Sequence, residues 1–336
     1  MEGSRIIFPA PFKIEVERFD LAGPGANEIL VETEATLIST GSELTALAGN
    51  FPADSLYWSS VAGYPYAPGY STVGTIKEIG PAVEGFKIGE RVAAGTGHAS
   101  HSVVDVGSVV RVPENVSVED ACFFTIAAGV MNSVRVAGVG LGESVVVVGL
   151  GLLGQVACLF SKLAGALPIV GIDLAEERLK SAARSGAAIT VRGDNWQSIQ
   201  DTVRKSTKGL MADTVFEVTG DPDVIPEAIK LVKEQGRLII LSAPRGKTSC
   251  FNFHDEVGAL GRTIMGANFG HSYHASLYPW TKRRNSELVF DLLSSGTLEV
   301  GHLITHKYPW HEAGEAYEML LEDRMKALGV ILQFTS

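Results

Sequence analysis

Residues 121–270 alternate between two hydrophobic patterns. Val145–Val148 is a continuous run of valines, which is typical of a strand buried on both faces. Leu152–Leu163 follows, with apolar residues three and four positions apart, and is predicted to be a helix. The same patterns predict strands at Ile169–Ile172, Thr214–Val218 and Leu238–Leu241 and helices at Glu176–Arg184 and Val224–Lys233, with Gly236 as the stop after the second helix. This alternation predicts an α/β fold with a doubly wound parallel sheet.

The chain before residue 121 shows short apolar runs separated by Gly and Pro. The predicted strands are Glu28–Ile38, Tyr70–Ile79, Arg91–Ala94, Ser102–Val106 and Val109–Val112. Repeated short strands with turn residues between them predict an all-β, barrel-like unit. Beyond residue 270 the pattern predicts helices near Asn285–Leu293 and Ala313–Leu321 and strands near Leu303–Tyr308 and Gly329–Phe334. We therefore divide the chain into residues 1–120, 121–270 and 271–336.

The charge balance is acidic: 28 Lys and Arg stand against 38 Asp and Glu, a formal net charge of −10 over 336 residues. Binders of nucleic acid or anionic membranes normally carry a basic surplus, so neither partner is expected. No apolar stretch reaches the ~18 residues of a membrane span, and Met1–Lys13 lacks the apolar run of a signal peptide. The three cysteines form no close pair, which fits a reducing compartment. We expect a cytoplasmic protein with a small-molecule substrate.

One glycine-rich turn stands where a nucleotide would bind. The segment Gly149-Leu150-Gly151-Leu152-Leu153-Gly154 follows the strand Val145–Val148 directly and opens a predicted helix. In this context the first glycine permits a tight turn, the second lets the backbone approach a pyrophosphate, and the third allows close packing of helix on strand. The N-terminus of the helix favours the negative charge. The turn therefore predicts a dinucleotide-binding site.

An acidic residue at the end of the next strand indicates which dinucleotide. Asp173 follows Gly154 by 19 residues, where a carboxylate can accept hydrogen bonds from both hydroxyls of the adenosine ribose. The same carboxylate would repel a 2′-phosphate, so we expect NAD(H) in preference to NADP(H). Arg178 leaves this preference open, because a nearby guanidinium can bind either a ribose or a phosphate.

At this point the chain resembles the medium-chain dehydrogenase/reductase superfamily, the group of zinc alcohol dehydrogenases and quinone oxidoreductases. The resemblance spans nearly the whole chain and is most specific at Ala67–Val92, Gly236–Pro244 and Met265–Gly270. It implies a Rossmann domain inserted into a GroES-like catalytic domain, an active site between the two, and a homo-oligomer, a dimer or a tetramer. It also implies further cofactor contacts from Thr219, Leu241, Ser242, Ala243, Ala267 and Phe269.

The chain departs from the zinc-dependent members at their ligand positions. Thr40 takes the place of the first zinc ligand in the segment Thr40-Gly41-Ser42-Glu43, and Tyr70 replaces the histidine ligand. The third position falls near Thr125 by a looser alignment. His98 and His101 lie three apart on a predicted strand or turn, which is poor spacing for joint chelation. The resemblance therefore implies a zinc-independent member without a bound metal, loosely similar to the bacteriochlorophyllide hydroxyethyl dehydrogenase branch.

Protein hydroxyls must then replace zinc in stabilising the developing charge and moving the proton. Ser42 matches the hydroxyl that relays the substrate proton in the zinc enzymes; the alternative is a serine that caps the following helix. Tyr70 stands where a ligand would point toward the substrate and either acts as proton donor or fills the space of the metal. Glu43 either orients these neighbours or is a surface carboxylate, and Thr40 completes the candidate catalytic set.

Three functions remain open from the sequence. The first is a zinc-independent, NAD(H)-dependent oxidoreductase that interconverts a polar secondary alcohol, such as a sugar, a cyclitol or a natural product, with its ketone. The second is an ene or quinone reductase, which usually prefers NADPH and acts on an activated C=C bond. The third is a non-catalytic nucleotide-binding protein. The segment Asn268–Asn285 mixes aromatic, His and Arg residues, as expected either beside a hydroxylated substrate or at a contact between subunits.

Overall fold

The computed structural model describes residues 1–52, 55, 58, 63–267 and 279–334, and within them the chain forms two compact units. The first unit combines Met1–Thr125 with Ser286–Ser336, and the second is the continuous segment Ile126–Asn285. One unit is therefore inserted into the sequence of the other, with boundaries after residues 125 and 285, where the sequence analysis placed them after 120 and 270.

The second unit contains the parallel sheet that the alternating pattern predicts. Its strands are β8 (Val145–Val148), β9 (Ile169–Asp173), β10 (Ile189–Arg192), β11 (Ala212–Glu217), β12 (Val232–Ile240) and β13 (Thr263–Gly266). They lie in the order β10-β9-β8-β11-β12-β13, and every neighbouring pair is parallel. The helices are α4 (Phe124–Ala137), which begins just before the boundary, α5 (Leu152–Leu163), α6 (Glu176–Arg184), α7 (Trp196–Ser206) and α8 (Ile225–Ala228). From β8 the chain adds β9 and β10 on one side of the sheet and then β11, β12 and β13 on the other side. This strand order confirms the predicted doubly wound fold.

The helix predicted at Val224–Lys233 is wrong in extent. Helix α8 ends at Ala228, a short 3-10 turn follows, and Val232 already begins β12. Gly236 is consequently not a helix stop but lies within β12. A Cβ atom there would lie 3.0 Å from the carbonyl oxygen of Asp213. This glycine allows β12 to pass close to β11 at a register shift, which a one-dimensional pattern does not reveal.

The first unit is a mixed sheet built from both ends of the chain. Its strands are β3 (Glu28–Leu37), β4 (Thr72–Ile79), β5 (Arg91–Ala94), β6 (His101–Asp105), β7 (Val110–Arg111), β14 (Ile304–Pro309) and β15 (Gly329–Gln333). Their order is β14-β15-β3-β4-β5-β7, with β6 also paired to β3. The pair β14–β15 is parallel and the other pairs are antiparallel. The predicted GroES-like β-unit is thereby confirmed, including the return of the chain from the second unit.

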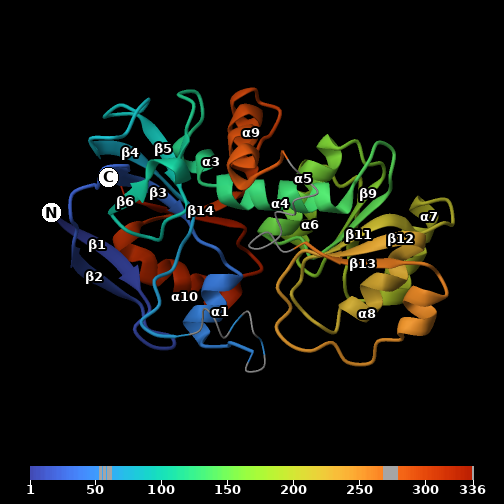
Figure 1. The fold of residues 1–336 in the computed structure, drawn as a ribbon. Coiled ribbons are helices and arrows are strands. Elements are labelled where there is room, and N and C mark those ends of the chain that lie inside the picture. The colour runs from blue at the N-terminus through green and yellow to red at the C-terminus, as the bar shows by residue number, and fades with distance from the viewer. Residues whose placement is uncertain (53–54, 56–57, 59–62, 268–278, 335–336) are drawn as a thin grey trace. The chain divides into compact units, whose positions relative to one another are not determined.

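Helices and a hairpin complete this unit. The helices are α1 (Ser42–Ala48), α3 (Val118–Ala121), α9 (Lys282–Ser294), which begins just before the boundary, and α10 (Ala313–Asp323), and the hairpin pairs β1 (Glu2–Ile7) with β2 (Glu15–Asp20). Figure 1 shows α10 beside α1, although the two come from opposite parts of the chain. Apolar residues of both helices share one core cluster with Phe8 and Leu332. This packing brings Glu43 on α1 close to Tyr317 on α10.

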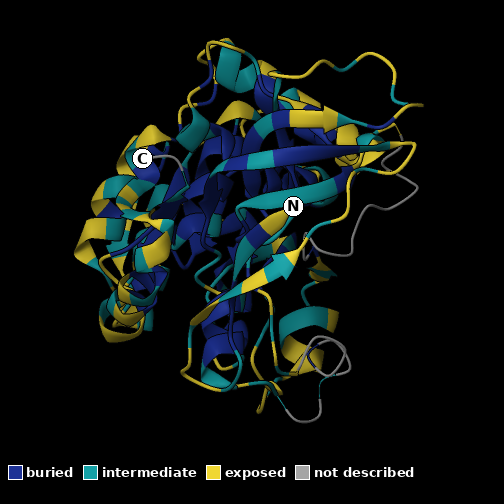
Figure 2. Ribbon diagram, turned by 90° about the vertical axis from the view of Figure 1, so that its left-hand side faces the viewer, coloured by how far each residue is buried: buried dark blue, intermediate teal, exposed yellow. Residues whose placement is uncertain are grey.

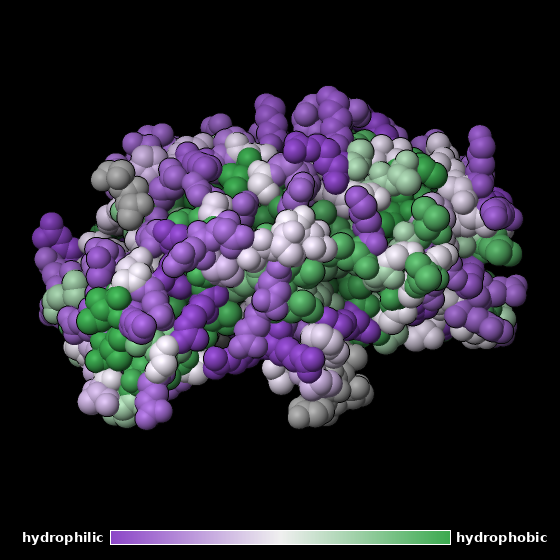
Figure 3. Space-filling view, turned by 90° about the horizontal axis from the view of Figure 1, so that it is seen from above, coloured by the Kyte–Doolittle hydropathy of each residue, from purple (hydrophilic) through white to green (hydrophobic). Residues whose placement is uncertain are grey.

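Burial follows the sheets. Figure 2 shows buried residues along the strands and exposed residues mainly on loops and outer helix faces. Hydrophilic side chains are spread over the face shown in Figure 3, with hydrophobic groups between them. Among the helices of the described residues, none combines the length and apolar character that crossing a lipid bilayer requires.

Candidate active site

The glycine turn after β8 has the shape that a pyrophosphate needs. Gly149 has φ of +94°, in the left-handed region that favours glycine. A Cβ on Gly154 would lie 1.9 Å from the carbonyl oxygen of Gly149, so only glycine fits there. Gly151 is the N-cap of α5 and no side chain caps the helix. These features leave the backbone of Gly149–Gly154 free of side chains at the N-terminus of α5, and the binding of a dinucleotide phosphate there stays a prediction.

Asp173 ends β9 beside this turn. Its Oδ2 accepts a hydrogen bond from the Leu150 N–H at 2.7 Å, and its Oδ1 accepts one from the Ala175 N–H at 2.9 Å. Nη1 of Arg178 lies 3.8 Å from Oδ2. The carboxylate is thus fixed against the glycine turn. Each oxygen keeps a second lone pair that can accept a ribose hydroxyl.

Two other predicted cofactor segments meet at a buried carboxylate that the sequence analysis missed. Oε1 of Glu217, at the end of β11, accepts the Thr219 N–H at 2.7 Å and also the Thr219 hydroxyl. Oε2 accepts the Ser242 hydroxyl at 2.7 Å, and Ser242 Oγ in turn accepts the Gly220 N–H at 3.1 Å. Glu217 is fully buried. It holds the loops after β11 and β12 in one arrangement.

Of the remaining predicted cofactor residues, three lie among the described residues and one does not. Leu241 follows β12 and is buried, and Ala243 lies two residues further along the same loop. Ala267 is also buried, and its carbonyl accepts the Ser133 hydroxyl at 2.6 Å. Phe269 lies outside the described residues, as does the part of the segment Asn268–Asn285 up to residue 278.

The three positions that the resemblance assigns to zinc ligands, Thr40, Tyr70 and Thr125, carry hydroxyl groups, and two of these hydroxyls donate hydrogen bonds within the protein. The Tyr70 hydroxyl donates to Ser39 Oγ at 2.6 Å, and the Thr125 hydroxyl donates to the Tyr70 carbonyl at 3.2 Å. Thr40 is half-buried between β3 and α1. The structure thus brings Tyr70 and Thr125 together and places Thr40 next to Ser39.

These donors do not fit a catalytic zinc ion, which prefers thiolate, imidazole and carboxylate ligands. Cys122 is fully buried, and burial, with nearby carboxylates, raises the pKa of its thiol well above the usual value. Across the described residues, no three His, Cys, Asp or Glu side chains are arranged to hold a metal ion.

Three hydroxyl groups form a chain at the N-terminus of α1. Ser39 Oγ lies 2.8 Å from Ser42 Oγ and accepts from Tyr70 on its other side. The N-cap of α1 is Gly41, and no side chain caps the helix, so the interpretation of Ser42 as a capping serine is wrong. Ser39 was not among the predicted site residues, because a serine beside a strand end has no sequence signal of its own.

Glu43 lies in the interior, so the alternative of a surface carboxylate is wrong. It is 1% exposed. Its Oε1 accepts the Ser39 N–H at 2.8 Å, and its Oε2 accepts the Tyr317 hydroxyl at 2.5 Å. Burial and the Glu43 carboxylate raise the pKa of Tyr317 well above its usual value. The position predicted to orient its neighbours therefore contacts Ser39 directly.

A buried histidine completes this cluster. His98 Nε2 lies 3.1 Å from Glu43 Oε2, and its Nδ1 lies 2.7 Å from Thr36 Oγ1. His101 begins β6, is half-buried, and has Nε2 at 3.9 Å from Glu32. The two histidines therefore have different surroundings. His98 and Tyr317 were missed as site residues, because only the folded chain brings them to Glu43.

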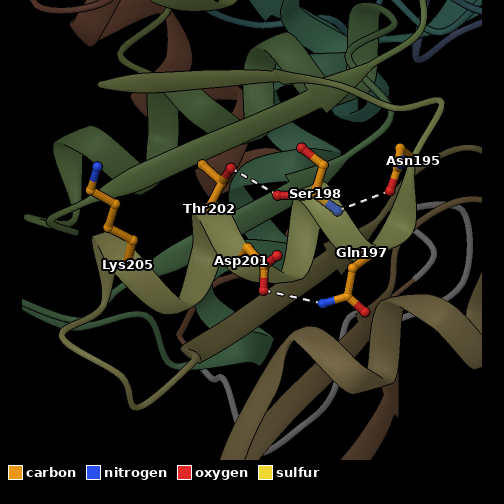
Figure 4. A pocket seen from close by; sticks show the side chains of 6 residues that line it. All are labelled: Asn195, Gln197, Ser198, Asp201, Thr202 and Lys205. Atoms are coloured by element: carbon orange, nitrogen blue, oxygen red, sulfur yellow. Dashed lines mark hydrogen bonds between the residues drawn. The ribbon is translucent and has the colours of Figure 1, made fainter.

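The surface hollow along α7 is not a candidate site. It is lined by six polar residues of the helix and its N-cap: Asn195, Gln197, Ser198, Asp201, Thr202 and Lys205 (Figure 4). Asn195 caps the helix by accepting the Ser198 N–H, and Gln197 donates to Asp201 on the next turn. These side chains bond to one another along one exposed helix and are not joined by side chains from another element in the lining of this hollow.

Two family models match consecutive parts of the chain. Residues 25–149 match the family model described as "Alcohol dehydrogenase GroES-like domain", and residues 153–282 match "Zinc-binding dehydrogenase". The L-threonine 3-dehydrogenase of Pyrococcus furiosus is 25% identical over 337 residues, which cover 91% of each chain. Sorbitol dehydrogenase 2 of Saccharomyces cerevisiae is 28% identical over 76% of this chain and 78% of its own. The crystal structure of 2R,3R-butanediol dehydrogenase from Bacillus subtilis shares the fold, with a TM-score of 0.82 and 20% identity over 99% of this chain and 100% of the other.

Proposed function

Because the chain belongs to the alcohol dehydrogenase-like, medium-chain dehydrogenase/reductase superfamily, we propose that it oxidises a polar secondary alcohol to its ketone with NAD⁺, and without zinc. The similar proteins named threonine, sorbitol and butanediol dehydrogenases support alcohol–ketone chemistry over reduction of a C=C bond. Their names also support a hydroxylated substrate. The observation that carries the zinc-free assignment is the hydroxyl of Tyr70, which stands at a ligand position and is bonded to Ser39 at 2.6 Å.

The chain's own groups would then handle the proton. The phenol oxygen of Tyr70 accepts the proton of the substrate hydroxyl and releases its own proton to a hydrogen-bonded neighbour while the carbon loses its hydride. Ser42 belongs to the same hydrogen-bonded row. NAD⁺, when bound, supplies the hydride acceptor. This division puts proton transfer in the first unit and cofactor binding in the second.

Asp173 supports NAD(H) over NADP(H). Its carboxylate is fixed by the Leu150 and Ala175 N–H groups, so it cannot turn away from a 2′-phosphate without losing both hydrogen bonds. Hydrogen bonds to a charged group contribute about 1.5–3 kcal/mol each. We expect the dissociation constant for NADPH to exceed that for NADH in the wild-type protein, and Asp173→Ala to lower the ratio of the two constants toward one. Titration of protein fluorescence with both nucleotides measures this ratio, and tighter NADPH binding by the wild-type protein would contradict the assignment.

The decisive experiment is turnover by protein that was purified with chelator and analysed for metal. We expect NADH to form with a panel of polyols and other secondary alcohols, and activity to survive chelation. Tyr70→Phe should lower kcat by about 100-fold or more, because general acid–base catalysis contributes about that factor. Tyr308→Phe, on β14, is a matched control. Stoichiometric zinc, loss of activity on chelation, or turnover confined to enones would contradict the proposal.

A further inference from the structure

Ser39 stands at the centre of the hydroxyl row, between the two residues that carry the proposed chemistry. Tyr70 donates to its Oγ at 2.6 Å, and Ser42 Oγ lies 2.8 Å away. A serine hydroxyl has one proton to donate and two lone pairs that accept. It can therefore accept from Tyr70 and donate to Ser42 at the same time, which is what a proton relay requires.

We propose that Ser39 is the relay residue that carries the proton between Tyr70 and Ser42, and that Glu43 is the positioning residue that holds Ser39 in place. The proposal rests on the proposed function. Among the hydrogen bonds described above, Ser39 is the group that links Tyr70 to Ser42.

The transfer balances at every oxygen. The substrate O–H bond breaks and its proton bonds to Tyr70 Oη as the hydride leaves the adjacent carbon for NAD⁺. The Tyr70 proton passes to Ser39 Oγ, the Ser39 proton passes to Ser42 Oγ, and the half-buried Ser42 releases its own proton to water. Each hydroxyl gains one proton and loses one. A Tyr70 hydroxyl that donates to Ser39 has the orientation that alcohol oxidation needs.

The backbone of Ser39 is fixed from the interior. Glu43 Oε1 accepts the Ser39 N–H at 2.8 Å, and the Glu43 N–H donates back to the Ser39 carbonyl at 3.0 Å. This reciprocal pair provides partners for the N–H and the carbonyl of Ser39. The Ser39 hydroxyl can therefore form its hydrogen bonds with Tyr70 and Ser42. The Glu43 carboxylate in turn faces Tyr317 and His98. A buried carboxylate held by several donors is rigid, so it can set the position of the serine.

The test uses Ser39→Ala, Ser39→Thr and, as a matched control, Ser108→Ala, which removes an exposed hydroxyl bonded to the Asp105 carbonyl. For each protein we would measure kcat and KM for alcohol oxidation, the solvent deuterium isotope effect on kcat, NADH affinity and the unfolding midpoint. We expect Ser39→Ala to lower kcat by about 100-fold and to change the solvent isotope effect, with KM and NADH affinity nearly unchanged. Ser39→Thr restores most of the lost kcat, because it restores the hydroxyl.

The outcomes separate this proposal from the one on which it rests. If wild-type protein oxidises alcohols and Ser39→Ala keeps kcat and the isotope effect, the relay is wrong while the function stands. If Ser39→Ala does not fold, Ser39→Cys keeps the size of the side chain with a weak hydrogen-bonding group, and the same loss is expected. If wild-type protein binds NADH but turns over no alcohol, the proposed function fails and the relay fails with it.

Discussion

The Tyr317 hydroxyl donates a hydrogen bond of 2.5 Å to Oε2 of Glu43, although 274 residues separate the two in sequence. Both side chains are buried. Helix α10 thus supplies a donor to a carboxylate on α1 that the interior would otherwise leave poorly solvated. The contact ties the last part of the chain to the segment that carries Ser39 and Ser42.

Tyr317→Phe removes this donor and leaves the Glu43 carboxylate with fewer partners. We expect the free energy of unfolding to fall by about 1–3 kcal/mol, because a buried charged acceptor loses a hydrogen bond. Tyr64→Phe is the matched control, since Tyr64 donates to the neutral Ala46 carbonyl on the same helix α1. Urea titration followed by fluorescence measures both variants. If Tyr317→Phe and Tyr64→Phe lower the free energy of unfolding equally, the charge of Glu43 adds nothing to the stability that the Tyr317 hydrogen bond provides.

The difference between Asp173 and Glu43 shows what a sequence can predict. Asp173, the glycine turn and the parallel sheet were predicted because their signals are local: a strand, a turn and a helix follow one another in the chain. The burial of Glu43 depends on His98 and Tyr317, which only tertiary packing brings to it. Glu217 was missed for a similar reason, because its role appears only when the loops after β11 and β12 lie side by side.

Gly151 allows the proposed cofactor site to be tested without disturbing the fold. A Cβ at this position would meet only an Arg178 side-chain nitrogen, at 3.8 Å, and the backbone φ of −61° suits any residue. Gly151→Ala should therefore fold normally but lose NADH affinity, because the methyl group occupies the space of the pyrophosphate. Gly154→Ala should instead lower stability. Gly140→Ala should change neither property, because the nearest atom to an added Cβ is a Glu143 side-chain carbon at 4.0 Å, an ordinary contact. Unchanged NADH binding by Gly151→Ala in a fluorescence titration would contradict this site.

Glu217→Gln tests the buried carboxylate between the cofactor loops. Glu217 accepts from the Thr219 N–H and from the Thr219 and Ser242 hydroxyls. An amide would turn an NH₂ group toward one of these donors, so the loops should loosen. We expect NADH affinity to fall by about tenfold, the loss of roughly one hydrogen bond. Glu227→Gln, on α8, weakens a half-buried ion pair with Lys230 and serves as the control, and calorimetric titration of both variants measures the difference.

The three thiols should differ sharply in reactivity. Cys158 is fully buried, and burial raises the pKa of its thiol to about 12, while Cys122 is shifted in the same direction. Cys250 is exposed. Because the thiolate is the nucleophile, native protein at pH 8 should react with one equivalent of a disulfide reagent, and denatured protein with three. Cys250→Ser should abolish the native reaction; rapid modification of that variant would show that Cys122 or Cys158 is accessible.

Asp213 gives the second unit a contribution to stability that depends on pH. Burial alone would raise the pKa of this carboxyl, but hydrogen bonds from Lys233 and from the N–H and hydroxyl of Ser144 lower it overall. A lowered pKa in the folded state means that the stabilisation is present above the unfolded pKa of about 3.9 and is lost as pH falls through the folded value. We therefore expect Asp213→Asn to lower the free energy of unfolding by about 1–3 kcal/mol at pH 7.

The same difference should shrink as the pH is lowered from 5 toward 3, because the wild-type carboxyl then becomes protonated and resembles the amide. Urea titrations across this range, read as the difference between wild type and variant, measure it. Asp201→Asn is the control, since Asp201 lies on exposed α7 and its side chain is 61% exposed. If the difference in unfolding free energy between wild type and Asp213→Asn stays constant from pH 7 to pH 3, the charge of the Asp213 carboxylate does not contribute to it.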